Sequence, residues 1–343
     1  MAESVKVVDP DLGSGYDYDS LFDWEAAQQA DIDTSNTIAV AKCRCTGGSA
    51  DVTLFTIDGW TSSATDYIKI WTDTSETYRH SGVWSDSKVR LVYSHAGLPF
   101  IKILENYVRI DGLQISNPNT ASNGQGGIWY NTADAAGKLI VTNCIIKGPP
   151  TAAGDNSGIT VTVATGATAV FVNNIVYDWA FCGILDADGT SGTIFYLYNN
   201  TIVSNGTHGF RSFGNASAII LYNNLIQGSS DKNYSLDSCT AITSAANISE
   251  DTSSPNAALR SIVIDFLLEA SDDYHLASTD TDAIGAGTNL YNDAVYPFQT
   301  DIDGQDRGGA AAAWDIGADE YVSAVTNLSI FASECVGSEG VFG

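Results

Sequence analysis

Five short segments in the middle of the chain share one pattern: a run of β-branched and aromatic residues, a polar turn residue, and a second apolar run. They recur at spacings of 32, 30, 26 and 24 residues when aligned on Asp111, Asn143, Asn173, Asn199 and Asn223. A looser copy, Ala246-Asn247-Ile248, follows at a spacing of 23. Periods of this size indicate a solenoid, in which each repeat stacks on its neighbours.

A second motif keeps the same step along the chain. It reads Gly-Ile-Trp-Tyr at 127–130 and returns in related form at 158–161, 183–186 and 209–212. Each copy predicts a strand of about five residues between tight turns. Because no helical period lies between the motifs, the repeats are not βαβ units. The pattern therefore predicts a coil of two or three short strands, each paired in parallel with its equivalent one coil further on, about 4.8 Å away.

The asparagines fit the turns of such a coil. Asparagine tolerates the left-handed backbone conformation, and stacked copies can bond side chain to side chain as a ladder, predicted here for Asn143, Asn173, Asn199 and Asn223. On these motifs the chain resembles the right-handed parallel β-helix proteins of the pectate-lyase-like class, over roughly residues 37–250. The resemblance implies an all-β, single-stranded right-handed parallel β-helix. It implies no particular activity, because one fold hosts many functions.

The chain divides into four predicted parts. Residues 1–36 contain a strand and a helix that Ser20 caps with Asp23 three residues on, covering the first coil. Residues 37–250 form the coils, with 71–88 as a projecting loop. Residues 251–321 contain segments such as 301–307 and 314–321 that resemble the closing segment of bacterial and viral β-helix repeat proteins. The apolar tail, 322–343, is predicted to dock on a neighbour through Leu328, Ile330, Phe331 and Phe342.

Charge and composition limit the partners. The 15 Lys and Arg against 41 Asp and Glu give a net charge of −26, which excludes nucleic acid as a partner and favours solubility. The first residues lack the pattern of a secretory signal, and no apolar stretch approaches the roughly 20 residues of a membrane span. We therefore expect synthesis in a cytoplasm and no membrane contact. The six scattered cysteines predict buried, reduced thiols.

A polysaccharide-cleaving β-helix needs carboxylates, or a carboxylate and a cation, on one outer face. The candidates are Asp186, Asp188, His208, Arg211 and Asp237. Strand parity places Arg211 on the same side as Trp129, Thr160, Leu185 and Ser235, and Asp186 on the other, which splits this set. The segment 207–210 is only a fragment of the Gly-His-Gly pattern of polygalacturonase-like enzymes. We therefore expect these residues to be solvated polar side chains on an outer sheet and not a catalytic set.

The sequence also contains a candidate sugar-binding set of aromatic residues and a candidate Ca²⁺ loop. Trp129, Trp179 and Tyr198 could form a platform for sugars, although aromatic residues also stack inside such coils. Asp301, Asp303 and Asp306 have the spacing of oxygen ligands in a Ca²⁺ loop, but Ala312 stands where an EF-hand has its glutamate. Apart from this weak Ca²⁺ candidate, no cofactor is expected.

The best hypothesis is a non-enzymatic structural protein of a phage virion, such as a capsid decoration, fibre or spike module. The pattern Val-Asp-Pro, the Gly-rich turn and Ile57-Asp58-Gly59-Trp60 resemble β-helix proteins encoded by phages and prophage-bearing bacteria. The expected partners are other virion proteins or copies of the chain, for instance in a trimer, with the protein ending in an extracellular particle. The alternatives are a polysaccharide lyase or hydrolase acting on a host surface glycan, and a non-catalytic glycan-binding module.

Overall fold

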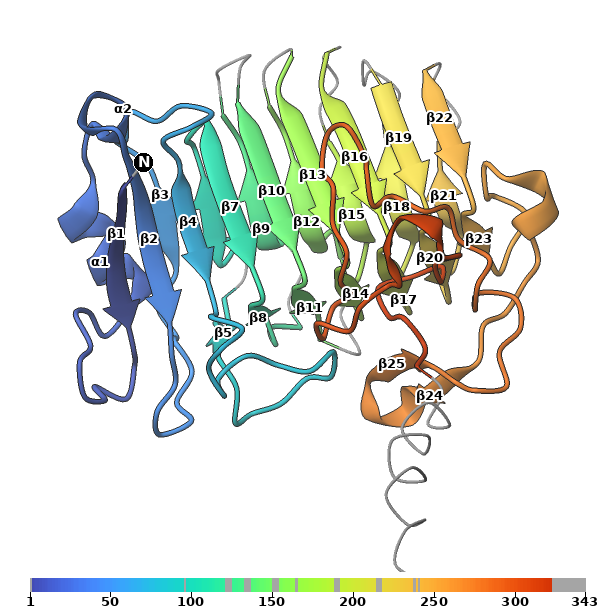
Figure 1. The fold of residues 1–343 in the computed structure, drawn as a ribbon, viewed down its shortest axis with the longest axis horizontal. Coiled ribbons are helices and arrows are strands. Elements are labelled where there is room, and N and C mark those ends of the chain that lie inside the picture. Colours follow the sequence, from blue (N-terminus) through green and yellow to red (C-terminus); the bar gives the residue numbers. More distant parts are fainter. Residues whose placement is uncertain are drawn as a thin grey trace, which may run out of the picture.

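The computed structural model describes residues 2–95, 97–120, 125–132, 137–149, 154–163, 166–187, 192–213, 218–236, 239 and 241–322. The chain winds into a parallel β-solenoid whose regular coils contribute one strand to each of three sheets (Figure 1). This confirms the predicted all-β, parallel β-helix fold. All strand pairs within the three sheets are parallel, as the repeat period requires.

The three sheets are named here in the order in which one regular coil, such as β7, β8 and β9, passes through them. The long sheet has nine strands: β1 Ala2–Val8, β2 Thr37–Cys43, β4 Ile68–Trp71, β7 Tyr107–Asp111, β10 Lys138–Thr142, β13 Thr168–Val172, β16 Ile194–Tyr198, β19 Ala218–Tyr222 and β22 Ile242–Ala245. The second sheet has seven: β5 Arg90–Val92, β8 Gln114–Ser116, β11 Ile145–Lys147, β14 Ile175–Tyr177, β17 Thr201–Val203, β20 Leu225–Gln227 and β23 Ile248–Ser249. The third sheet also has seven: β3 Phe55–Ile57, β6 Ile101–Ile103, β9 Gln125–Tyr130, β12 Ser157–Val161, β15 Cys182–Asp186, β18 His208–Ser212 and β21 Lys232–Ser235.

The corner between the long and second sheets is a two-residue turn, whose first residue has a left-handed backbone. We call these first residues the outer column: Gly112, Asn143, Asn173, Asn199, Asn223 and Ala246, all with φ between 51° and 72°. The sequence alignment was wrong by one residue at its first member, because Asp111 pairs with Thr142 and Gly112 therefore stands beside Asn143. Asparagine and glycine are favoured here because they adopt positive φ at the lowest cost.

The second residues of the same turns form a ladder inside the coil. In this inner column, each amide Nδ2 donates to the next Oδ1 at 2.8–3.0 Å, through Asn174, Asn200, Asn224, Asn247 and Asn256. Each Oδ1 also accepts from a backbone N–H of the preceding coil, as from Cys144 to Asn174. The predicted asparagine ladder is confirmed, but its continuous part lies one residue later than predicted.

The predicted ladder residues bond to one another only in pairs. Asn173 donates to Asn143 Oδ1 at 3.1 Å, and Asn223 donates to Asn199 Oδ1 at 2.9 Å. Between these pairs, Asn199 Nδ2 donates instead to the carbonyls of Asp315 and Gly317. The outer column therefore holds both neighbouring coils and a segment from the end of the chain.

Apolar side chains stack inside the coil in register with the strands. Val141, Phe171, Leu197 and Leu221 are paired neighbours on the long sheet, and all are fully buried. Burying a side chain of this size contributes roughly 1.5–3 kcal/mol, so such stacks supply most of the stability of the coil.

The N-terminal end of the core is covered by a helix, as predicted. The helix α1 (Leu21–Gln28) is capped by Ser20 Oγ, which accepts from the Asp23 N–H at 3.1 Å. Its residues Leu21 and Trp24 are fully buried, and Trp24 packs against Trp60 of the first coils with ring centroids 5.6 Å apart. The short helix α2 (Ile32–Ser35) follows and leads into β2.

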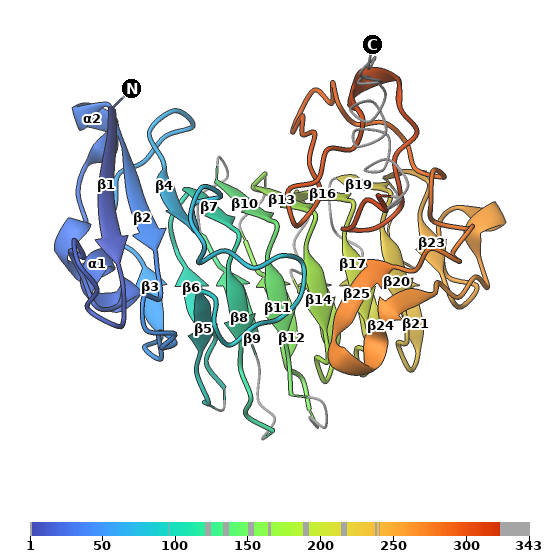
Figure 2. The same ribbon diagram turned by 60° about the horizontal axis from the view of Figure 1, so that its bottom comes forward.

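The C-terminal segment, residues 251–322, folds back along the outside of the coils (Figures 1 and 2). It contains three 3₁₀ turns and one antiparallel pair of strands: η1 Ala257–Leu259, η2 Glu269–Ser271, η3 Gly309–Ala311, β24 Phe266–Leu268 and β25 Asp273–Leu276. It buries outward side chains of two sheets in separate clusters. Ile175 and Tyr177 of the second sheet pack with Tyr274, and Val172 of the long sheet packs with Trp314.

The loop between β4 and β5, residues 71–88, does not project as predicted. Figure 2 shows it lying across the second sheet beside β8 and β11. Arg79 forms a salt bridge with Asp111 at 2.7 Å, and Gln114 bonds to both the N–H and the carbonyl of Ser85. The loop also meets the outer column, because His80 Nε2 donates to the Asn143 carbonyl at 2.9 Å. These polar contacts hold the loop against the coils. They produce no strand period in the sequence, so the sequence did not predict them.

Candidate functional site

The first predicted site lies on the third sheet and is split, as strand parity indicated. Leu185 pairs with Arg211 and Asp186 pairs with Ser212, so Asp186 and Arg211 face opposite sides. Asp186 is buried and accepts from Ser212 Oγ at 2.6 Å. His208 and Arg211 do come together, with Arg211 Nη1 donating to His208 Nε2 at 2.9 Å. Burial, and then the neighbouring Arg211, lower the pKa of His208, so this pair holds a neutral imidazole beside a guanidinium. Asp188 and Asp237 lie outside the described residues.

The predicted aromatic platform is not formed. Trp129 lies half-buried on the outer side of the third sheet, with its Nε1 donating to Thr162 Oγ1 at 2.5 Å. Trp179 is fully buried inside the coil, where its Nε1 donates to the Ile146 carbonyl at 3.0 Å. Tyr198 is covered by the C-terminal segment, in a cluster with Leu290 and Trp314. Because Trp179 and Tyr198 are buried, only Trp129 of the three is accessible to a ligand.

The three aspartates of the predicted calcium loop do not share one site, although the side chains of Asp301 and Asp303 interact with each other. Asp301 accepts from the backbone N–H groups of Gln305 and Glu320, at 2.7 and 3.0 Å, and so closes its own turn. Asp306 accepts from the Gly308 N–H at 2.9 Å on the exposed side. Only Asp303 turns toward a different group of side chains. The three carboxylates therefore do not converge on one point.

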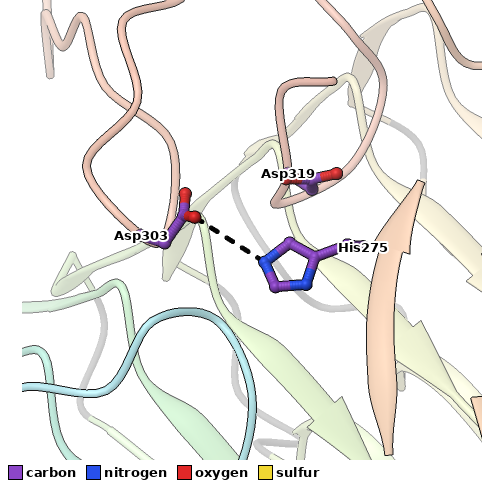
Figure 3. Close-up of side chains that lie close together, drawn as sticks. All are labelled: His275, Asp303 and Asp319. Carbon is purple, nitrogen blue, oxygen red and sulfur yellow. Dashed lines mark ion pairs between the residues drawn. The ribbon is translucent and has the colours of Figure 1, made fainter. Parts of the chain in front are cut away.

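That group is a cluster of His275, Asp303 and Asp319, which the sequence did not predict (Figure 3). One ligand atom from each residue lies within 4.8 Å of the others. Three segments supply them: β25, the 301–306 turn and the closing stretch before Tyr321. Among the described residues, this is the one group of three such side chains that approach so closely. The segments were visible in the sequence, but no repeat period relates them, so nothing predicted their meeting.

Hydrogen bonds orient the members of the cluster. His275 Nδ1 donates to Asp273 Oδ1 at 2.6 Å, and its Nε2 lies 3.8 Å from Asp303 Oδ2. Asp319 Oδ2 accepts from the Leu276 N–H at 2.7 Å, which fixes that carboxylate against β25. Gln305 Nε2 donates to Asp303 Oδ2 at 2.8 Å. The backbone and neighbouring side chains thus hold all three groups facing one another.

The electrostatic environment of the cluster favours positive charge. Burial alone would lower the pKa of His275, but Asp319, Asp273 and Asp303 raise it above its ordinary value. Burial raises the pKa of Asp319, and burial together with the Asp303 side chain raises that of Asp301. Several carboxylates therefore share a poorly solvated region and resist ionising together.

The cluster faces a cleft of about 530 Å³ between the C-terminal segment and the loop 71–88. The lining includes Ser81, Val83, Leu267 and Tyr321 in addition to the cluster. The loop passes close to the imidazole at Gly82, where an added methyl group would lie 2.4 Å from His275 Nε2. A small ligand can therefore reach the cluster through the cleft. At position 82 only glycine fits, because any side chain there would collide with the His275 imidazole.

A second, smaller hollow of about 90 Å³ lies on the outer side of the long sheet. Tyr67, Arg109 and Lys138 line it, and the Arg109 guanidinium lies 3.6 Å from the centre of the Tyr67 ring. Burial, and then Arg109, lower the pKa of Lys138. Two cations beside an aromatic ring are unusual on a protein of net charge −26.

The fold and these sites define a parallel β-solenoid protein with a histidine and aspartate cluster on its outer layer. No protein-family model and no curated protein matches this chain. None of the described helices has the length and apolar character needed to cross a membrane. The five described cysteines are free thiols, and four of them are buried.

Proposed function

We propose that this protein is a non-enzymatic structural module of a bacteriophage virion, such as a capsid decoration protein, a fibre or a spike module. The observation that carries the proposal is the covering of the coils by the C-terminal segment. Outward side chains of the long and second sheets, which would otherwise meet solvent or a substrate, are buried in three clusters with that segment. These sheet faces therefore stabilise the fold by packing against the C-terminal segment.

The polar groups between the two layers support the same proposal. Arg307 is fully buried, forms a salt bridge with Glu320 at 3.0 Å, and donates to Asn173 Oδ1 at 3.1 Å. Asn223 donates to the Thr288 carbonyl at 2.7 Å and accepts from the Thr288 N–H at 2.7 Å. Buried charged and amide groups in such positions join segments far apart in sequence. A solenoid whose coils are bonded to a covering segment at several points is rigid, which suits a component that must keep its shape outside a cell.

The proposed partners are other virion proteins or further copies of the chain, in an extracellular particle after synthesis in the host cytoplasm. The tail, 322–343, is the proposed contact. Leu328, Ile330, Phe331 and Phe342 lie outside the described residues, so their docking role stays a prediction. Deleting 322–343 should abolish co-sedimentation with particles or self-association in light scattering. Unchanged assembly of the truncated protein would contradict this role.

Purified particles test the proposal directly. Antibodies against the recombinant protein should label intact particles in immunogold electron microscopy, and mass spectrometry should recover the protein from the particle band of a density gradient. The recombinant protein should release neither reducing ends nor unsaturated sugars from host capsule or cell-wall polysaccharide. Recovery only outside the particle band, or sugar release, would contradict the proposal and favour a lyase or hydrolase.

One observation favours glycan binding as a second candidate function. The hollow beside Tyr67 holds two cations, Arg109 and Lys138, which suit the carboxylate of an acidic sugar. Glycan-array binding that is lost in Arg109→Ala, while Trp129→Ala binds normally, would support this function. Loss in Trp129→Ala instead would move the binding to the third sheet.

A further inference from the structure

The cluster of His275, Asp303 and Asp319 has the hydrogen-bonding pattern of a metal site. The Nδ1–H of His275 is held by Asp273 at 2.6 Å. With the hydrogen on Nδ1, the lone pair of a neutral imidazole lies on Nε2, which points toward Asp303 (Figure 3). Metal-binding histidines are commonly oriented in this way, by a carboxylate on the other ring nitrogen.

One nitrogen of the cluster is buried without a partner. His275 Nε2 is shielded from solvent and has no hydrogen-bond partner in the part of the chain that the structure describes. The 3.8 Å between Nε2 and Asp303 Oδ2 is too long for a hydrogen bond. Buried polar atoms are normally satisfied, so this nitrogen, facing two carboxylates, indicates a missing ligand.

The spacing fits a small cation. Nitrogen and oxygen ligands bind Zn²⁺ at roughly 2.0–2.2 Å, so two ligands of one ion lie at most about 4.4 Å apart. The three donor atoms lie within 4.8 Å of one another, and a shift of a few tenths of an ångström would bring the widest pair into range. The place beside Nε2 is free of side chains because Gly82 lies against it.

The donor set selects the kind of ion. Ca²⁺ and Mg²⁺ take oxygen ligands, whereas an imidazole nitrogen with two carboxylates suits Zn²⁺ and similar transition metals. The charge also fits, since the Asp273 carboxylate on His275 Nδ1 adds to the two ligand carboxylates, against Arg307 as the neighbouring permanent cation. A divalent ion would balance part of this excess.

We propose that His275 Nε2, Asp303 and Asp319 bind one divalent transition-metal ion of the Zn²⁺ type. The ion ties together β25, the 301–306 turn and the closing stretch of the C-terminal segment, beside Gly82 of the loop 71–88. Water fills the remaining coordination positions from the cleft. This inference does not depend on the virion assignment, because it concerns how the outer layer is held together.

Titration of chelator-treated, full-length protein with ZnCl₂ tests the proposal. Calorimetry should give one saturable site, and zinc should raise the midpoint of thermal unfolding, because an ion that binds only the folded state stabilises it. His275→Gln and Asp319→Asn should each weaken binding by at least about tenfold. The matched control is Asp306→Asn, in the same turn but facing Gly308, which should bind within twofold of the wild type. CaCl₂ should bind more weakly than ZnCl₂.

Crystals of the wild-type protein soaked in ZnCl₂ give a second readout that does not depend on any variant folding. An anomalous peak at the zinc edge beside His275 Nε2 is the expected result. A wild-type protein without saturable zinc binding would overturn the proposal. So would zinc binding that survives in both variants, or an anomalous peak elsewhere, since the acidic surface alone would then explain the binding.

Discussion

The two columns of turn residues on one corner of the coil differ by one position in sequence and hold different parts of the molecule. The inner column, from Asn174 to Asn256, bonds coil to coil in an unbroken ladder inside the core. The outer column uses Asn173, Asn199 and Asn223 to bind the C-terminal segment. Each Asn-Asn doublet thus bonds both the neighbouring coils and the C-terminal segment. Which of the two an amide bonds depends on whether it faces into the coil or out of it.

The largest effect is expected at the inner column. Asn200→Ala removes the acceptor of the Asn174 N–H, one of the two acceptors of Asn174 Nδ2, and the side-chain donor to Asn224 Oδ1, all of them fully buried. Each buried donor left without a partner costs about 1–3 kcal/mol, so the free energy of unfolding should fall by about 3–5 kcal/mol. Urea denaturation followed by circular dichroism measures this loss. A loss below about 1 kcal/mol would mean that the ladder is not a main support of the coils.

The next effect is expected where the outer column meets a buried charge. Arg307→Met leaves Glu320 without its salt bridge and Asn173 Oδ1 without a donor. Breaking a buried ion pair from one side costs about 3–5 kcal/mol, here within the C-terminal segment. Limited proteolysis should cut between 283 and 321 much faster than in the wild type, while the coils stay intact. Uniform cleavage across the chain would show that the two layers unfold together.

A smaller effect is expected at the outer column itself. Asn199→Gly keeps the left-handed backbone conformation, whose φ is 51°, but removes the bonds to Asp315 and Gly317 and the bond from Asn223. Three hydrogen bonds of ordinary strength give a loss of about 1.5–4.5 kcal/mol, centred below the loss for Asn200→Ala. The same urea denaturation compares the two neighbours directly. An equal or larger loss in Asn199→Gly would reverse the roles of the two columns.

The last effect depends on pH and concerns the loop 71–88, which meets the outer column through His80. Burial lowers the pKa of His80 to about 3, so the folded state holds the neutral ring. The unfolded state takes up a proton below its ordinary pKa of about 6.5, so stability from this group is complete above pH 6.5 and is lost as the pH falls toward 3. The loss approaches about 1.4 kcal/mol per pH unit between these values. Urea midpoints from pH 7 to 4 should fall less in His80→Gln, and parallel curves would contradict this role.

Much of the coil was predictable because the repeat fixes its register. The strand period, the left-handed turns, the Ser20 cap and the opposite sides of Asp186 and Arg211 all follow from local pattern and parity. The inner column was visible as the doublets at 173–174, 199–200 and 223–224, but sequence does not say which amide faces inward. The error at Asp111 has the same origin, since a turn residue can be glycine as well as asparagine.

The outer layer was predictable only as a set of segments. His275, Asp303 and Asp319 lie 28 and 16 residues apart in a stretch without a period, so their meeting depends on tertiary packing alone. The burial of Trp179 and Tyr198 likewise depends on which side of the strand and which covering segment they meet. Residue type alone could not exclude them from a sugar platform.

Hydrogen exchange followed by mass spectrometry is the most direct test of two layers held by two columns. It should be measured on the wild type, Asn200→Ala and Asn199→Gly under the same conditions. If each column holds its own layer, exchange should be faster through the coils from 168 to 227 in Asn200→Ala, and faster mainly in 283–321 in Asn199→Gly. Equal acceleration of the coils by both substitutions, or acceleration confined to the C-terminal segment in Asn200→Ala, would contradict this arrangement.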